Sequence, residues 1–155
     1  MKSINRTVIM LVSRVLFVLY IILLAYFLFF SERYGRTITS SEYRYNLVLF
    51  KEVRRFILYR KEIGFESFIV NIFGNVLAFA PFGFVLPIIS TSNRKLLNIT
   101  LLSLEFSLTI ELIQLIYKVG IFDVDDIFMN TIGGTLGGIC FIICHKLIKS
   151  IKKLR

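Results

Sequence analysis

Residues 110–138 read IELIQLIYKVGIFDVDDIFMNTIGGTLGG, and this stretch decides the fold because it joins two strongly hydrophobic segments. It contains four acids and two amides, namely Glu111, Asp123, Asp125, Asp126, Gln114 and Asn130. A charged carboxylate in the hydrocarbon layer of a membrane costs about 3 kcal/mol or more. Glu111 lies within the third of the hydrophobic segments, so it must face the protein interior, carry a proton or have a partner.

The rest of the chain is apolar enough to place most of it in lipid. Of its 155 residues, 56% are hydrophobic, more than a soluble domain of this length usually contains. Four segments are long enough for membrane-spanning helices, and they cover approximately residues 7–30, 68–90, 96–117 and 127–148. Strict alternation of polar and apolar residues is absent, which excludes a membrane barrel. We predict an all-α integral membrane bundle of four transmembrane helices, forming a single domain over residues 1–155.

The first segment is predicted to remain as an anchor, because its apolar run is too long for a signal peptide and Phe29 and Phe30 stand where a cleavage site needs small residues. Between the first two segments, apolar residues recur at helical spacing within residues 44–62 and cations fall elsewhere. This pattern predicts a short amphipathic helix in the membrane interface. A partly ordered loop covering the end of the bundle is the alternative.

The formal charge of +9 indicates a partner with negative charge. The basic residues lie between or after the hydrophobic segments, so anionic lipid headgroups are the expected partner and nucleic acid is not. With four spans, the side that holds the termini carries ten Lys and Arg and the other side nine. Short loops count most in the positive-inside rule. On those terms we predict cytoplasmic termini and an external DVDD loop.

The second segment begins with Asn71 and Asn75, which are four residues apart and share one helical face. Pro81 removes a backbone donor, and Gly83 weakens the helix further. Such a kink can open a pocket between helices, or it can serve only to shape their packing.

The third segment carries a polar stripe that ends in Glu111, Gln114 and Lys118. Asp123, Asp126 and Asn130 share a face of the fourth segment if its helix begins by Asp123. Below them, the pairs Gly133/Gly137 and Gly134/Gly138 permit close helix contact. We therefore expect the two polar faces to meet, joined by Asn71 and Asn75.

A cluster of carboxylates and amides allows several kinds of chemistry. It could bind a divalent cation through Glu111, Asp123 and Asp126, hydrogen-bond a sugar or peptide, or supply an acid and a base. Interhelical hydrogen bonds together with an N-cap are the purely structural alternative. No cofactor is predicted. Cys140 and Cys144 could seat a metal, but packing is the favoured interpretation.

Three blocks of the sequence together resemble the VanZ-like membrane family. They are NIFGNVLAFAPFGFVLP (71–87), SLTIELIQ (107–114) and FDVDDIFMNTIGGTLGG (122–138), and YNLVLFKEV (45–53) resembles the stretch after the first helix of that family. Many members carry an arginine where this chain has Gly120, so that any role of the arginine would fall to Lys118.

The resemblance implies a bacterial plasma-membrane protein of the cell envelope. The family is named for a member that gives low-level resistance to teicoplanin, a glycopeptide antibiotic. The motif residues of the family correspond here to Asn75, Pro81, Gly83, Glu111, Gln114, Asp123, Asp126, Asn130 and Gly134.

Three functions are compatible with this sequence. The favoured one is a non-enzymatic factor whose outward site binds an envelope ligand or the glycopeptide itself. The alternatives are an enzyme and a small transporter, each acting on a lipid-linked or peptidoglycan precursor. The sequence predicts neither the ligand nor the oligomeric state.

Overall fold

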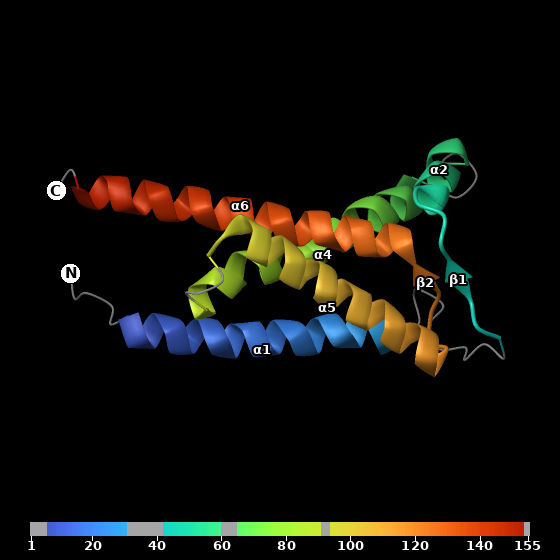
Figure 1. Ribbon diagram of the computed structural model, residues 1–155, viewed down its shortest axis with the longest axis horizontal. Helices are drawn as coiled ribbons and strands as arrows, with labels where there is room; N and C mark the ends of the chain where they lie inside the picture. Colours follow the sequence, from blue (N-terminus) through green and yellow to red (C-terminus); the bar gives the residue numbers. More distant parts are fainter. Residues whose placement is uncertain (1–5, 31–41, 60–64, 91–93, 154–155) are drawn as a thin grey trace.

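A computed structural model describes residues 6–30, 42–59, 65–90 and 94–153, and it confirms the all-α class. Along the chain the elements are α1 (Arg6–Phe30), β1 (Tyr45–Asn46), α2 (Lys51–Leu58), α4 (Phe65–Ile89), α5 (Leu96–Tyr117), β2 (Phe122–Asp123) and α6 (Val124–Lys153). The four long helices form an elongated bundle, and the short elements gather at one end of it (Figure 1).

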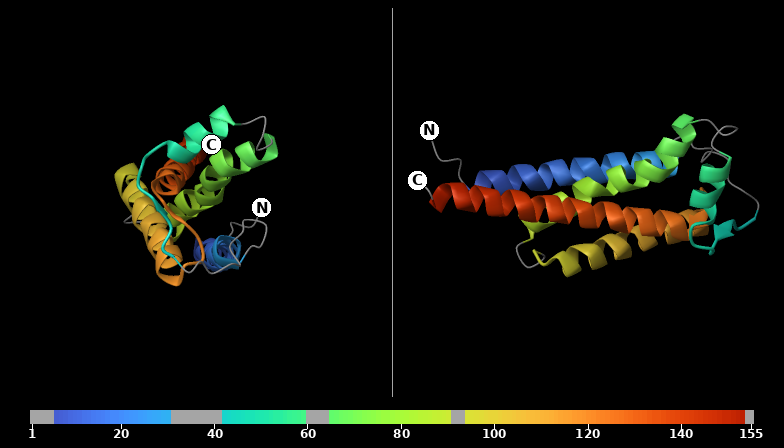
Figure 2. Two further views of the ribbon diagram at one scale, coloured as in Figure 1. Left: turned by 90° about the vertical axis from the view of Figure 1, so that its right-hand side faces the viewer. Right: turned by 90° about the horizontal axis from the view of Figure 1, so that it is seen from above.

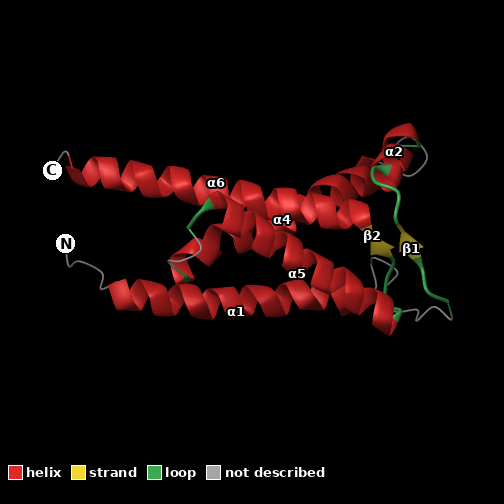
Figure 3. Cartoon of the chain, in the orientation of Figure 1, coloured by secondary structure: helices red, strands yellow, loops and turns green. Residues whose placement is uncertain are grey.

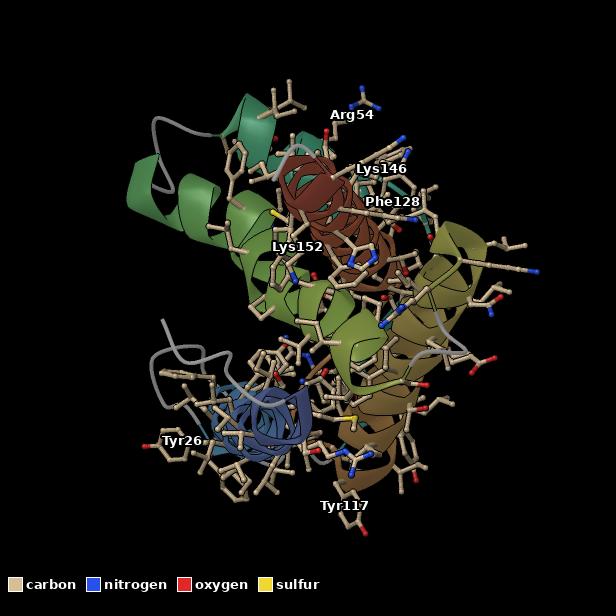
Figure 4. All side chains as sticks on the ribbon, turned by 90° about the vertical axis from the view of Figure 1, so that its left-hand side faces the viewer. Tyr26, Arg54, Tyr117, Phe128, Lys146 and Lys152 are labelled. Carbon is tan, nitrogen blue, oxygen red and sulfur yellow. The ribbon has the colours of Figure 1, made fainter. Side chains whose placement is uncertain are left out.

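Three helices in the described part of the chain are long and apolar enough to cross a membrane. They are Thr7–Phe30 in α1, Leu96–Tyr117 in α5 and Val124–Lys153 in α6. The described apolar part of α4 is shorter, Phe73–Ile89. The side chain of Tyr26 points away from the bundle, as does that of Tyr117 (Figure 4). Both tyrosines lie near the end of a long helix, where this residue is enriched at membrane–water interfaces.

The closest helix contact lies between α4 and α6, and glycines make it possible. A Cβ atom built on Gly133 would lie 2.2 Å from the carbonyl oxygen of Val76, and one on Gly137 would lie 2.0 Å from that of Ala80. From the other side, a Cβ on Gly83 would lie 1.7 Å from the carbonyl oxygen of Gly134. Backbone therefore touches backbone along this crossing, as in other membrane helix pairs with small residues at the interface.

The next two glycines of α6 face α5. A Cβ on Gly134 would lie 2.0 Å from Ser103 Oγ, and one on Gly138 would lie 3.0 Å from two side-chain carbons of Ile99. Ser103 and Ile99 are fully buried. The sequence GGTLGG thus presents one glycine pair to α4 and the other to α5, so α6 packs closely against both helices.

α1 is the peripheral helix and packs mainly against α4. Its Tyr20 hydroxyl donates to the carbonyl oxygen of Ala78 at 2.6 Å. This carbonyl follows that of Leu77, which Pro81 leaves without its usual helical donor. Phe82 and Phe106 stack at 4.8 Å between ring centroids and help to fill the contact region of α4 and α5.

α4 continues as a helix through both Pro81 and Pro87. Pro81 is exposed, whereas Gly83 and Pro87 are buried. Proline at position 81 therefore sits on the outer side of α4, and the glycine two residues later makes the close contact with α6. The side chain of Asn71 lies outside the part of α4 whose side chains are described.

The first residues of α1 and the last residues of α6 lie at the same end of the bundle (Figure 1). The opposite end carries β1, β2 and α2, which we call the cap and define as residues 43–58 and 118–126. Seen from that end, the cap runs across the ends of the long helices (Figure 2). Its two strands, shown in Figure 3, pair in parallel, with Tyr45 opposite Phe122 and Asn46 opposite Asp123.

The helix expected over residues 44–62 is shorter in the structure, where α2 covers Lys51–Leu58. Tyr45 and Asn46 instead form strand β1, because they pair with the chain that enters α6. Phe50 then has φ 63°, a left-handed conformation that no helix interior accommodates. Residues 60–62 lie outside the described part.

Candidate functional site

Asp123 lies just before α6, and this corrects the expected arrangement in which it shared a helical face with Asp126 and Asn130. The helix begins at Val124, and Asp123 belongs to β2. Its Oδ1 accepts from the backbone N–H of Asp125 at 2.8 Å, which is the geometry of an N-cap. The same oxygen accepts from the Asn46 side-chain amide at 3.0 Å. This carboxylate therefore joins the start of α6 to the cap.

Glu111 supports the same turn from α5. Its carboxylate is only 2% exposed, and Oε2 accepts from the backbone N–H of Asp123 at 2.9 Å. A buried carboxylate has to recover the hydration that it loses, and a hydrogen bond from a backbone N–H returns part of it. Glu111 thus fixes the chain where it turns from α5 into α6.

Asp125 is the third buried acid at this end of the bundle, and it was not among the candidate ligand residues. It is 3% exposed, and its carboxylate accepts from the backbone N–H groups of Phe50 and Val53. These groups lie at the start of α2, whose own N-cap residue, Phe50, makes no side-chain capping bond. Asp125 therefore caps α2 from another element, where the helix dipole also favours negative charge. The ring of Phe50 packs edge-on against Phe128, with centroids 5.3 Å apart.

Asp126 and Asn75 join α6 to α4. The Asn75 side-chain amide donates to Asp126 Oδ1 at 2.5 Å, and both side chains are half-buried. This predicted contact between the second segment and the acids is present among the described side chains. Asp126 is also the least enclosed of the three aspartates.

Asn130 lies one helical turn further into the bundle and pairs with α5. Its amide nitrogen donates to Ser107 Oγ at 2.8 Å, and the residue is 2% exposed. Within the described part of the chain, its Oδ1 is buried and has no hydrogen-bond partner. An unsatisfied buried acceptor is uncommon in proteins and costs about 1–3 kcal/mol.

The side chains of Gln114 and Lys118 contact other parts of the molecule than Glu111 does. The Gln114 amide donates to the carbonyl oxygen of Leu28 at 2.9 Å and so ties α5 to α1. Lys118 ends α5 in a left-handed conformation with φ 55°. Its Nζ lies 4.6 Å from the centroid of the Tyr43 ring, a cation–π contact with the cap. The predicted polar stripe is thus divided among three partners.

Asn46, like Asp125, was not among the candidate site residues predicted from the sequence. It is 5% exposed, donates to Asp123 as described above, and accepts from the backbone N–H of Val48 at 3.2 Å. An asparagine that bonds the backbone two residues later forms an Asx turn. Its partner Asp123 lies 77 residues away, so the sequence alone could not show this pairing.

Hydrogen bonds from N–H groups hold the acids at this end of the bundle. In the described ranges, no three or more His, Cys, Asp or Glu side chains come together in a way that could hold a metal ion. The acids accept instead from backbone and amide N–H groups. Cys140 and Cys144 are free and exposed near the other end of α6. The polar groups therefore organise the cap and leave Asp126 and Asn75 at its border.

These features define a helical membrane protein whose buried carboxylates and amides hold a cap on one end of the bundle. Residues 17–145 match the VanZ/LLP1 family. The chain belongs to this family, which confirms the resemblance found in the sequence.

One relative is Protein VanZ from Enterococcus faecium, which is 40% identical over 63 residues. The matched stretch covers 41% of this chain and 38% of that protein. No solved structure matches this chain.

Proposed function

We propose that this chain is a multi-pass protein of the bacterial plasma membrane that binds a cell-envelope ligand or a glycopeptide antibiotic at the border of its cap. In this proposal it acts as a teicoplanin-resistance factor without catalysing a reaction. The observation that carries it is the hydrogen bond between Asn75 and Asp126, a half-buried polar pair at the cap end of α4 and α6.

A membrane position with four spans is part of the proposal, with α4 as the fourth. Its apolar part, Phe73–Ile89, is roughly 26 Å long at the rise of an α-helix, close to the thickness of a hydrocarbon core. α4 also packs between α1 and α6, so its polar groups are shielded by protein. With four spans, the cap lies outside the cell and the termini lie inside, as the short-loop charges favour.

The polar pair suits a ligand with both hydrogen-bond donors and acceptors. Asp126 offers carboxylate oxygens, and Asn75 offers an amide that can also accept. Peptide and sugar groups of cell-wall precursors, and of glycopeptides, carry matching groups. Glu111, Asp123 and Asp125 are buried on internal donors, so in this proposal they position the cap and do not touch the ligand.

The test is resistance in a teicoplanin-susceptible bacterial host that produces the full chain. We expect Asp126→Ala to abolish the increase in the inhibitory concentration of teicoplanin, because the pair with Asn75 is lost. Glu105→Gln is the matched control, since Glu105 is an exposed acid on α5. Amounts of both variants in the membrane fraction must equal wild type. Retained resistance in Asp126→Ala, or equal loss in Glu105→Gln, would contradict the proposal.

Binding is measured separately on the detergent-purified chain. A ligand that binds only the native state raises the apparent melting temperature by mass action. Teicoplanin should raise that of wild type and of Glu105→Gln, and leave that of Asp126→Ala unchanged. An equal shift in all three proteins would place binding elsewhere.

A further inference from the structure

The outer face of α2 concentrates positive charge. Lys51, Arg54 and Arg55 follow the spacing i, i+3, i+4, so they share one side of the helix. All three side chains are exposed, and that of Arg54 stands clear of the bundle in Figure 4. Val53, on another side of α2, is half-buried, so the charged side is the one turned outward.

The orientation of α2 places these three cations at about the same position along the bundle axis. In the right view of Figure 2, α2 lies across the end of the bundle, whereas α6 runs along its length. Cations on a helix that lies parallel to a membrane surface all reach the headgroup layer together. The lysines in the last turns of α6, by contrast, belong to a helix that runs along the bundle axis, so successive turns place them at different levels.

The position of α2 is held by the rest of the molecule. Asp125 accepts from the first backbone N–H groups of the helix, and the contact between Phe50 and Phe128 fixes its starting point. Little ordering is therefore required when a ligand binds the charged face, and preorganisation of this kind strengthens binding.

Exposed apolar side chains adjoin the cations and indicate a lipid as the partner. Leu47 and Val48 are 65% and 63% exposed just before the helix, and Leu58 is 64% exposed at its end. A free phosphate or an acidic polymer in water would leave these groups uncovered. A lipid supplies a phosphate for the cations and acyl chains for the apolar groups.

We infer that the outer face of α2, with Lys51 and Arg54 as its principal cations, is a binding site for the phosphate of an anionic phospholipid. This site is separate from the pair of Asn75 and Asp126. It does not depend on the ligand of that pair or on the side of the membrane at which the cap lies.

The experiment uses the full chain purified in a neutral detergent. Dioctanoylphosphatidylglycerol is titrated while the melting of the helices is followed by circular dichroism, with dioctanoylphosphatidylcholine and inorganic phosphate as separate arms. The variant Lys51→Gln/Arg54→Gln removes two cations. Lys149→Gln/Lys152→Gln removes two cations with the same spacing from the exposed end of α6.

We expect phosphatidylglycerol to raise the melting temperature of wild type far more than either of the other compounds. A cation near an anionic lipid surface contributes about fivefold in affinity, so the α2 variant should bind about 25-fold more weakly. The α6 variant should remain within about threefold of wild type on the same scale.

Three results would overturn the inference. If both variants bound phosphatidylglycerol equally more weakly than wild type, the effect would be one of general charge. If the α2 variant bound it as tightly as wild type, the lipid would bind elsewhere. Equal stabilisation by inorganic phosphate would identify a free anion as the ligand. Because none of these residues belongs to the polar pair, the outcome for resistance in Asp126→Ala is independent.

Discussion

Gly137→Ala is the sharpest test of the packing that places the polar groups. Gly137 faces α4 from the middle of α6, where an added Cβ would lie 2.0 Å from the carbonyl oxygen of Ala80 and 2.9 Å from the backbone nitrogen of Phe84. Both are backbone atoms of a helix, so neither can turn aside as a side chain would. The contact can be relieved only if α4 and α6 separate.

The size of the effect follows from these distances. Ordinary contact begins at 3.4 Å, so the two helices would have to move roughly 1.4 Å apart at this point in a closely packed interior. Overpacking of this kind costs about 1–3 kcal/mol. Separation also weakens the neighbouring contacts of Gly133 and Gly83, which favours the upper part of that range. Alanine returns about 0.5–1 kcal/mol through its better helix propensity. The net loss is about 2 kcal/mol, which corresponds to a fall of roughly 4–8 °C in melting temperature.

Gly138→Ala is the matched control because the same change occurs one residue further along the same helix. There the new Cβ would lie 3.0 Å from side-chain carbons of Ile99, which can shift by a few tenths of an ångström. We expect this variant to melt within about 3 °C of wild type. The assay is thermal unfolding of both purified proteins in detergent, followed by circular dichroism. If Gly137→Ala were as stable as Gly138→Ala, the close α4–α6 contact and its explanation would be wrong.

Two further predictions concern the cap and the buried amide. Asp125→Ala should raise the rate of hydrogen–deuterium exchange in α2, because a lost N-cap costs about 1–2 kcal/mol. Exchange in α5 should stay unchanged. If the exchange rates in α2 were the same in the variant and in wild type, the capping role of Asp125 would be wrong. Ser107→Ala should destabilise the protein by about 1–3 kcal/mol, since it leaves Asn130 without its partner, and Ser107→Ala/Asn130→Leu should recover most of that loss. Unfolding measurements on the three proteins would decide this, and a double variant less stable than Ser107→Ala would contradict it.

Much of the helical framework could be predicted from the sequence. The segment expected over residues 96–117 coincides with α5, and the first segment ends at Phe30 as α1 does. Long apolar runs specify helices locally, because each backbone N–H finds its acceptor four residues away. The fourth segment was placed at 127–148, whereas α6 extends over Val124–Lys153, because polar residues at both ends continue the helix.

The candidate site was predictable in its residues but only partly in its contacts. The expectation that Asp123, Asp126 and Asn130 share one face failed, because Asp123 caps α6 from the preceding strand. Asn46 and Asp125 were missed as members of the cluster, although both are buried. A capping residue can be recognised locally, but the donor that an acid receives from a distant segment cannot.

By itself, the sequence determined that this chain is an all-α membrane protein of the VanZ/LLP1 family and that small residues in α6 permit close contact, because hydrophobic length and residue size are local properties. Only the tertiary structure decided which polar groups meet. Asn46 reaches Asp123 across 77 residues, and Asp125 accepts from Phe50, the N-cap residue of α2, across 75 residues. These pairs depend on how β1 and α2 lie over the start of α6. A buried hydrogen-bonding group takes whichever partner the tertiary fold brings within reach.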